Sequence, residues 1–73
     1  MGKFELTEIH VLNGEAKVQT IFEGTKKACR KYKKVLDENI YKKNNKGLAK
    51  EDNSIYICNE NETFILAINE RTN

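Results

Sequence analysis

The stretch KKACRKYKKVLDENIYKK, residues 26–43, decides the fold of this 73-residue chain. Its apolar residues recur at the three- and four-residue spacing that places side chains on one face of an α-helix. This apolar stripe consists of Ala28, Cys29, Tyr32, Val35, Leu36 and Ile40. At about 100° per residue, it lies almost opposite a basic set formed by Lys26, Lys27, Arg30, Lys31, Lys33 and Lys34. We therefore expect a long amphipathic helix that buries the stripe and turns its ammonium groups to water.

The sequence also marks both ends of this helix. Thr25 follows Gly24 and precedes the first periodic residues, and threonine side chains accept hydrogen bonds from the free N–H groups of a first helical turn. Thr25 is therefore the predicted N-cap. The pattern continues to about residue 45, and we expect the helix to stop before Gly47.

A β-hairpin is expected before the helix. Residues 3–12 and 15–23 flank the dipeptide Asn13-Gly14. Both central positions of a type I′ turn need positive φ, which asparagine tolerates and glycine adopts freely. The dipeptide therefore predicts two antiparallel strands joined by a two-residue loop.

The register of this hairpin conflicts with its hydrophobic pattern. Phe4 and Leu6 have the opposite parity from Ile9 and Val11, so a regular strand cannot place all four on one face. One extra residue near positions 7–8, a β-bulge, would return Phe4 and Leu6 to the buried face. We predict such a bulge.

The second half of the chain predicts a loop and another hairpin. Residues 46–53 are polar and are interpreted as a loop, whereas residues 54–58 and 62–69 have strand-like composition. The last strand is apolar on both faces, which is typical of an interior strand. The expected fold is a single α+β domain over residues 1–73. Its order is ββαββ, with one long amphipathic helix packed on one face of a four-stranded antiparallel sheet.

Charge is distributed unevenly along the chain. The net charge is only +2, but residues 26–50 carry ten basic residues against two acidic ones. Residues 1–25 and residues 51–73 carry net charges of −2 and −4. The molecule is therefore better described as a dipole than as a basic protein.

The composition suggests a cytoplasmic setting. We expect no secretory signal, because the first 20 residues lack a continuous apolar stretch, and no membrane span. Two cysteines are too few for a disulfide scaffold, which indicates a reducing cytoplasm. A chain rich in Lys, Asn, Ile and Glu, without Pro or Trp, is typical of an AT-rich bacterial or phage genome, so a phage origin is possible.

No catalytic or metal-binding constellation can be identified. His10 is the only histidine, and we expect it near the hairpin tip on the side away from the core. Cys29 and Cys58 have no neighbouring base in sequence, and a small buried apolar role is expected for both. The three residues lack metal-ligand spacing, and no glycine-rich phosphate loop is present. The expectation is a protein that is not an enzyme and has no cofactor or metal.

The basic helix face is the unusual feature. Lysines in a first helical turn oppose the helix dipole, and sequence neighbours of like charge repel one another. The helical pattern places Tyr41 among the lysines, where an aromatic ring could stack on a nucleobase. The candidate partner- or phosphate-binding residues are Lys26, Lys27, Arg30, Lys31, Lys34 and Tyr41. The face could meet an acidic protein or nucleic acid, or it could simply be solvated.

A second candidate surface is the sheet face away from the helix. One helix covers only one side of a sheet, so apolar side chains of the other side stay open. The residues expected there are Leu12, Ile21, Ile65 and Ala67. They could form a homodimer or partner interface, or they could be scattered surface residues of the ordinary kind.

The leading functional hypothesis is a small non-enzymatic binding or regulatory protein. It would act by protein–protein contact through the basic helix face and the open sheet face, in the manner of an accessory protein of a phage or mobile element. The alternative is a nucleic-acid-binding protein whose lysine-rich helix contacts phosphates. Such binding should weaken steeply with salt.

Overall fold

The N-terminal hairpin forms as its turn sequence predicts. In the computed structural model, which describes residues 3–71, Asn13 and Gly14 join β1 (Phe4–Leu12) to β2 (Glu15–Gly24). Their φ angles of 51° and 83° are the positive values that a type I′ turn requires. The predicted hairpin is confirmed.

The predicted bulge is present, but its extra residue lies in the partner strand. Leu6 pairs with Phe22 and Thr7 pairs with Thr20, which leaves Ile21 of β2 without a partner in β1. Because β1 itself stays regular, its side chains alternate strictly between the two faces of the sheet. The expectation that one buried face would collect Phe4, Leu6, Ile9 and Val11 was therefore wrong: the first two lie on the opposite face from the last two.

Three helical segments follow Gly24 without an intervening loop. They are α1 (Lys26–Leu36), a π-helical turn η1 (Asp37–Tyr41) and α2 (Lys42–Asn44). The Thr25 side chain accepts a 3.0 Å hydrogen bond from the backbone N–H of Ala28, so the predicted N-cap is confirmed. The helical residues end at Asn44, within one residue of the predicted boundary.

The sheet has five strands, where four were predicted. After the helix come β3 (Lys46–Ala49), β4 (Asn53–Asn59) and β5 (Glu62–Glu70), which gives the order ββαβββ. The strands are all antiparallel and lie in the order β2-β1-β5-β4-β3. The prediction that the last strand is interior is confirmed, because β5 is the central strand.

The additional strand falls in the segment that the sequence analysis interpreted as a loop. Lys46, Gly47, Leu48 and Ala49 pair with the first half of β4. Glycine at position 47 allows β3 to approach closely, because a Cβ atom there would lie 2.1 Å from the backbone oxygen of Ile55. A four-residue strand that contains one glycine is too short to show a clear alternation of apolar and polar residues. The sequence analysis missed the strand for this reason.

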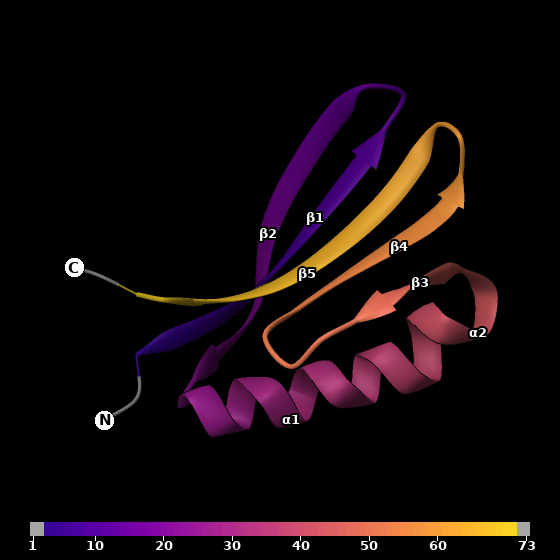
Figure 1. Ribbon diagram of the computed structural model, residues 1–73. Coiled ribbons are helices and arrows are strands. Elements are labelled where there is room, and N and C mark those ends of the chain that lie inside the picture. Colours follow the sequence, from indigo (N-terminus) through magenta and orange to yellow (C-terminus); the bar gives the residue numbers. More distant parts are fainter. Residues whose placement is uncertain (1–2, 72–73) are drawn as a thin grey trace.

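The core lies between the helix and one face of the sheet. All helical segments are on the same side of the sheet in Figure 1, and no described element covers the other side. Leu6, Tyr56 and Leu66 are fully buried under the helix, one from each of β1, β4 and β5, and Tyr41 of η1 closes the cluster. Phe22, Leu36, Ala49, Phe64, Ile21 and Ile68 pack around them.

The helix is rotated relative to its predicted orientation. The residues it buries form a line at four-residue spacing, called here the buried line: Cys29, Lys33, Asp37 and Tyr41. By contrast, Tyr32, Val35 and Ile40 of the apolar stripe are 41%, 51% and 52% exposed. The prediction that the stripe is buried was therefore wrong for these three residues, although Cys29 is fully buried and Leu36 packs against the core. The prediction that every lysine faces water was also wrong, since Lys33 is only 2% exposed.

The π-helical turn keeps the buried line straight. On an α-helix, a four-residue step overshoots a full turn by about 40°, so such a line drifts around the helix. A π turn is wider and reverses this drift. The backbone N–H of Lys42 bonds to the carbonyl oxygen of Asp37, five residues earlier, and Tyr41 is thereby returned to the sheet side.

The close approach of β3 can be tested with Gly47→Ala. The added methyl group would collide with the Ile55 carbonyl oxygen and with the Tyr56 ring, whose Cδ1 lies 2.7 Å from the Cβ position. We expect a loss of about 1–3 kcal/mol in the free energy of unfolding, measured by urea denaturation. Lys46→Ala, on the exposed neighbouring residue, serves as the control. An unchanged urea midpoint for Gly47→Ala would contradict the assigned pairing of β3.

Candidate functional site

A buried polar network fixes the helix on the sheet. The Lys33 Nζ donates to Asp37 Oδ2 at 2.8 Å and to the backbone oxygen of Lys50 at 2.5 Å. The Tyr56 hydroxyl donates to the other carboxylate oxygen of Asp37 at 2.6 Å. Both charges are therefore neutralised and hydrogen-bonded, as burial of an ion pair requires. Burial, followed by the bond to Asp37, raises the pKa of Tyr56 to about 12.

Tyr41 belongs to this interior and not to the basic face. Its hydroxyl donates to the Glu8 carboxylate of β1, and its ring stacks on Tyr56 with centroids 5.2 Å apart. Its edge meets Phe64 at 5.4 Å. Burial, followed by the bond to Glu8, raises the pKa of Tyr41 well above its usual range. The predicted position of Tyr41 among exposed lysines was wrong, because the helix is rotated, and the ring is not accessible to a nucleobase.

Two of the predicted binding cations are engaged within the chain. Arg30 forms a bidentate ion pair with Asp52, in which Nε donates to Oδ1 at 2.7 Å and Nη2 donates to Oδ2 at 3.2 Å. The Nη2 atom also lies 3.4 Å from a Glu51 carboxylate oxygen. The Lys26 Nζ lies 3.9 Å from Asp52 and 5.7 Å from the centre of the Phe4 ring. The hydrogen bond from Arg30 lowers the pKa of Asp52. These contacts tie the start of the helix to the β3–β4 connection.

The remaining predicted cations are exposed. Lys27, Lys31 and Lys34 lie on the outer side of α1, and none forms an ion pair with a residue in the described range. The basic face is therefore narrower than the sequence predicts. The predicted binding set had five cations and a tyrosine, whereas the structure leaves three ammonium groups available to a partner.

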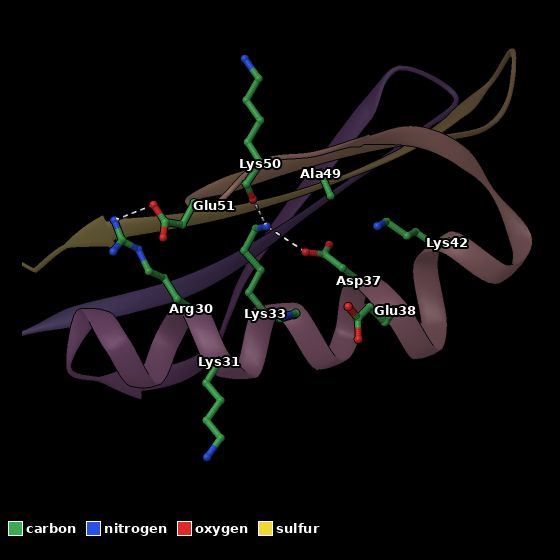
Figure 2. A pocket seen from close by; sticks show the side chains of 10 residues that line it. Arg30, Lys31, Lys33, Asp37, Glu38, Lys42, Ala49, Lys50 and Glu51 are labelled. Atoms are coloured by element: carbon green, nitrogen blue, oxygen red, sulfur yellow. Dashed lines mark hydrogen bonds and ion pairs between the residues drawn. The ribbon is translucent and has the colours of Figure 1, made fainter.

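A cleft of about 340 Å³ lies between the helix and the β3–β4 connection. Its lining is rich in cations, but Figure 2 shows that these do not converge on an empty centre. Lys33 is bonded to Asp37 and to the Lys50 carbonyl, while the side chains of Lys31 and Lys50 point away. Glu38 and Glu51 add negative charge at the rim. The cleft is a poor anion site as it stands.

An apolar groove lies on the other flank of the helix. It has a volume of about 490 Å³ and is lined by Phe22, Ala28, Lys31, Tyr32, Val35 and Leu36. Phe22 of β2 and Tyr32 of α1 stack with ring centroids 4.9 Å apart and form its floor at one end. Four residues of the stripe that the sequence assigned to the core, Ala28, Tyr32, Val35 and Leu36, thus line an open groove.

The sheet face away from the helix is also open and apolar. The register aligns five aliphatic side chains across all five strands, in the order Val18, Ile9, Ile65, Ile55 and Leu48. We call this line the central row, and the face that carries it the open sheet face. Of the residues predicted there, Ile65 and Ala67 lie on this face. Leu12 alternates onto the helix side with Leu6, and Ile21 is the unpaired bulge residue.

The side chains that could take part in catalysis or bind a metal do not assemble into a reactive centre. The His10 Nε2 lies 2.6 Å from a Glu62 oxygen, and its ring stacks on Phe64 at 4.2 Å. Burial raises the pKa values of the Cys29 and Cys58 thiols, which lowers their reactivity. Within residues 3–71, no three His, Cys, Asp or Glu side chains are placed to hold a metal ion.

Comparison with known proteins gives no further guide to function. The chain matches no protein-family model, no curated protein and no solved structure. In the described part of the chain, no helix is long and apolar enough to cross a membrane. The two apolar surfaces and the three exposed lysines are therefore the features from which a function must be argued.

The buried ion pair can be tested by removing one partner. Lys33→Met leaves Asp37 charged and buried, which should lower the free energy of unfolding by about 3–5 kcal/mol. Adding Asp37→Leu removes that charge and should restore part of the loss, although the Tyr56 hydroxyl then lacks its acceptor. Lys34→Met, on the exposed neighbour, should change stability by less than about 0.5 kcal/mol. Equal urea midpoints for Lys33→Met and Lys34→Met would refute the buried position of Lys33.

The raised pKa of Tyr56 predicts a pH dependence of stability. An unfolded tyrosine titrates near 10, whereas Tyr56 in the folded chain titrates near 12, so folding favours the neutral phenol. This contribution is fully present below pH 10 and is lost as the pH rises to 12. The free energy of unfolding should fall more steeply over this interval in the wild type than in Tyr56→Phe. The difference should be at most about 1.4 kcal/mol per pH unit, measured by urea denaturation. Parallel slopes for the two proteins would contradict it.

Proposed function

We propose that this chain is a non-enzymatic binding module that acts by protein–protein contact. The apolar groove on α1 would receive an amphipathic protein segment that carries acidic residues beside its apolar side chains. The observation that carries this proposal is the orientation of the helix: Tyr32, Val35 and Ile40 of its apolar stripe face outward. The buried line, which includes the charged Lys33 and Asp37, faces the sheet.

This orientation is unusual for a helix on a sheet. An amphipathic helix normally buries its apolar stripe, because that removes the most apolar surface from water. Here a rotation of roughly a quarter turn would bring Tyr32 and Val35 toward the sheet. It would also break the bonds of Lys33 and Asp37 and strand both charges. The polar network therefore holds an apolar surface open to solvent, where a partner can use it.

The charges beside the groove suggest which partner fits. Lys31 lines the groove, and Lys27 and Lys34 lie next to it on the outer side of the helix. A partner helix that lays apolar residues into the groove would bring its flanking residues against these lysines, as in the helix-in-groove mode of recognition. Acidic flanks would speed association and disfavour basic competitors. A cytoplasmic setting fits the two cysteines, both of which are free thiols.

The alternative function, nucleic-acid binding, has less support. Tyr41 is inside the core, and Lys26 and Arg30 are paired with Asp52, so three lysines remain for phosphate contacts. Each phosphate contact adds only modestly to affinity at physiological salt, and arginine, the better reader of base edges, is not available.

The proposal can be tested with a labelled peptide of designed sequence. The probe is a helical peptide with leucines at i, i+3, i+4 and i+7 and with glutamates beside them. The control peptide has the same sequence with lysines in place of the glutamates. By fluorescence polarisation, the acidic peptide should bind at least about tenfold more tightly than the basic one. Val35→Asp should weaken binding by a similar factor, because it places a charge in the groove.

Val18→Asp is the matched control, since Val18 is 65% exposed but lies on the opposite side of the molecule. It should leave peptide affinity unchanged. The proposal fails if both peptides bind alike or if Val35→Asp has no effect. Binding of a single-stranded DNA probe that is lost when Lys27, Lys31 and Lys34 are replaced would favour the alternative instead.

A further inference from the structure

We propose that the open sheet face is covered by a second copy of this chain, giving a face-to-face homodimer. This inference goes beyond the proposed function and uses the opposite surface of the molecule. It starts from the central row, whose exposed members include Val18 at 65%, Leu48 at 59% and Ile55 at 43%. An uninterrupted aliphatic row across five strands is not the pattern of a sheet face that stays in water.

The rows on either side of the central row carry no charge over most of their length. One contains Ala16, Val11, Thr63 and Ile57 and ends at Lys46 on the edge of β3. The other contains Thr20, Thr7, Ala67 and Asn53. Charges return at the margins, at Lys46 on the edge of β3 and where Arg71 bridges Glu5 and Glu23. The face therefore has an apolar centre and a polar rim, which is the usual anatomy of a protein interface.

The two sides of the first hairpin show the reverse of the ordinary pattern. On the helix side, the register aligns Glu8 with Gln19 and His10 with Lys17, and Glu8 and His10 contact Tyr41 and Phe64 at the edge of the core. On the open side, it aligns Ile9 with Val18 and Val11 with Ala16. The polar side of this hairpin is thus the one that lies on the helix side of the sheet. Its apolar side belongs to the open sheet face, where only another protein surface could remove it from water.

The size of the face suits a dimer. Five strands about 4.8 Å apart and three rows about 7 Å apart make a patch of roughly 500 Å² on each copy. Two such patches bury about 1,000 Å² in total, which is the lower limit for a specific interface. A 73-residue chain also buries a small share of its own surface, so the added burial matters for its stability.

The chemistry of the face selects a second copy as its occupant. Every residue of the central row is aliphatic, so the face is complementary to itself and brings no like charges together at its centre when two copies meet. The apolar groove does not share this property, because Lys27, Lys31 and Lys34 of two copies would repel one another there. Pairing through the sheet also closes the assembly, because each copy uses its single open face.

The mass of the protein in solution tests this inference. Sedimentation equilibrium over a wide concentration range should give twice the 8.5 kDa of one chain at the higher concentrations. Ile55→Lys places a charge in the central row and should weaken self-association by more than about a hundredfold. Val18→Lys repeats the test at the edge strand, where a folding defect is less expected. Circular dichroism and a proton–nitrogen correlation spectrum establish that each variant is folded.

Val35→Lys, at a residue of similar exposure in the apolar groove, is the matched control and should leave the dimer intact. A mixed sample of labelled and unlabelled chains should show intermolecular contacts between isoleucine methyl groups of the central row. A wild type that stays monomeric up to millimolar concentration would overturn the inference, and so would a dimer broken by Val35→Lys but not by Ile55→Lys. Peptide binding by monomeric Ile55→Lys reports on the groove separately, so the two proposals can fail independently.

Discussion

The hydrogen-bonded ion pair between Lys33 and Asp37 is the constraint on which the rest of this structure depends. It ties the middle of the helix to the β3–β4 connection through the Lys50 carbonyl and to β4 through the Tyr56 hydroxyl. A buried ion pair of this kind contributes little net stability compared with apolar residues of similar volume, but it tolerates only one geometry, because moving either charge leaves the other unpaired. Its effect is therefore to select one rotation of the helix. We infer that Tyr41 follows from the same constraint, since the π turn that begins at Asp37 carries it back to the sheet.

Both candidate surfaces follow from how this small chain divides its apolar residues. The helix uses its buried line for the sheet, so Tyr32 and Val35 of the stripe are left beside Phe22 in the groove. The sheet, in turn, has a helix on one face only, and the bulge at Ile21 leaves β1 regular, so that Ile9 and its neighbours collect on the uncovered side. A chain that maximised its own burial would have closed at least one of these surfaces. Two open apolar surfaces reduce the stability of the isolated monomer. Such surfaces are expected in a protein that buries them against other chains.

The sequence predicts those features that depend on local chemistry. The Asn13-Gly14 turn, the Thr25 cap, the existence and end of the helix and the interior position of the last strand are all confirmed. The features it missed depend on contacts between distant residues. A periodic pattern cannot show that the Lys33 ammonium group will donate a hydrogen bond to a backbone carbonyl seventeen positions away, so the pattern placed it in solvent. The spacing of Lys33 and Asp37, opposite charges four residues apart, was the available signal. The edge strand at residues 46–49 has no such signal in the sequence, because its strand character comes from pairing with β4.

The candidate surfaces lie on opposite sides of one sheet, and this arrangement decides how they can work together. The open sheet face carries no charge at its centre, so it would discriminate between partners by shape and by the exclusion of polar groups. The groove carries Lys31 at its wall and Lys27 and Lys34 beside it, so it would discriminate between partners by charge. In a dimer formed through the open faces, each helix stays on the outside and its groove remains accessible. Two grooves held on one rigid body would bind a partner with two acidic amphipathic segments more tightly than either groove alone, provided that the spacing of the segments matches. Self-association would then strengthen partner binding without any contact between the two kinds of surface.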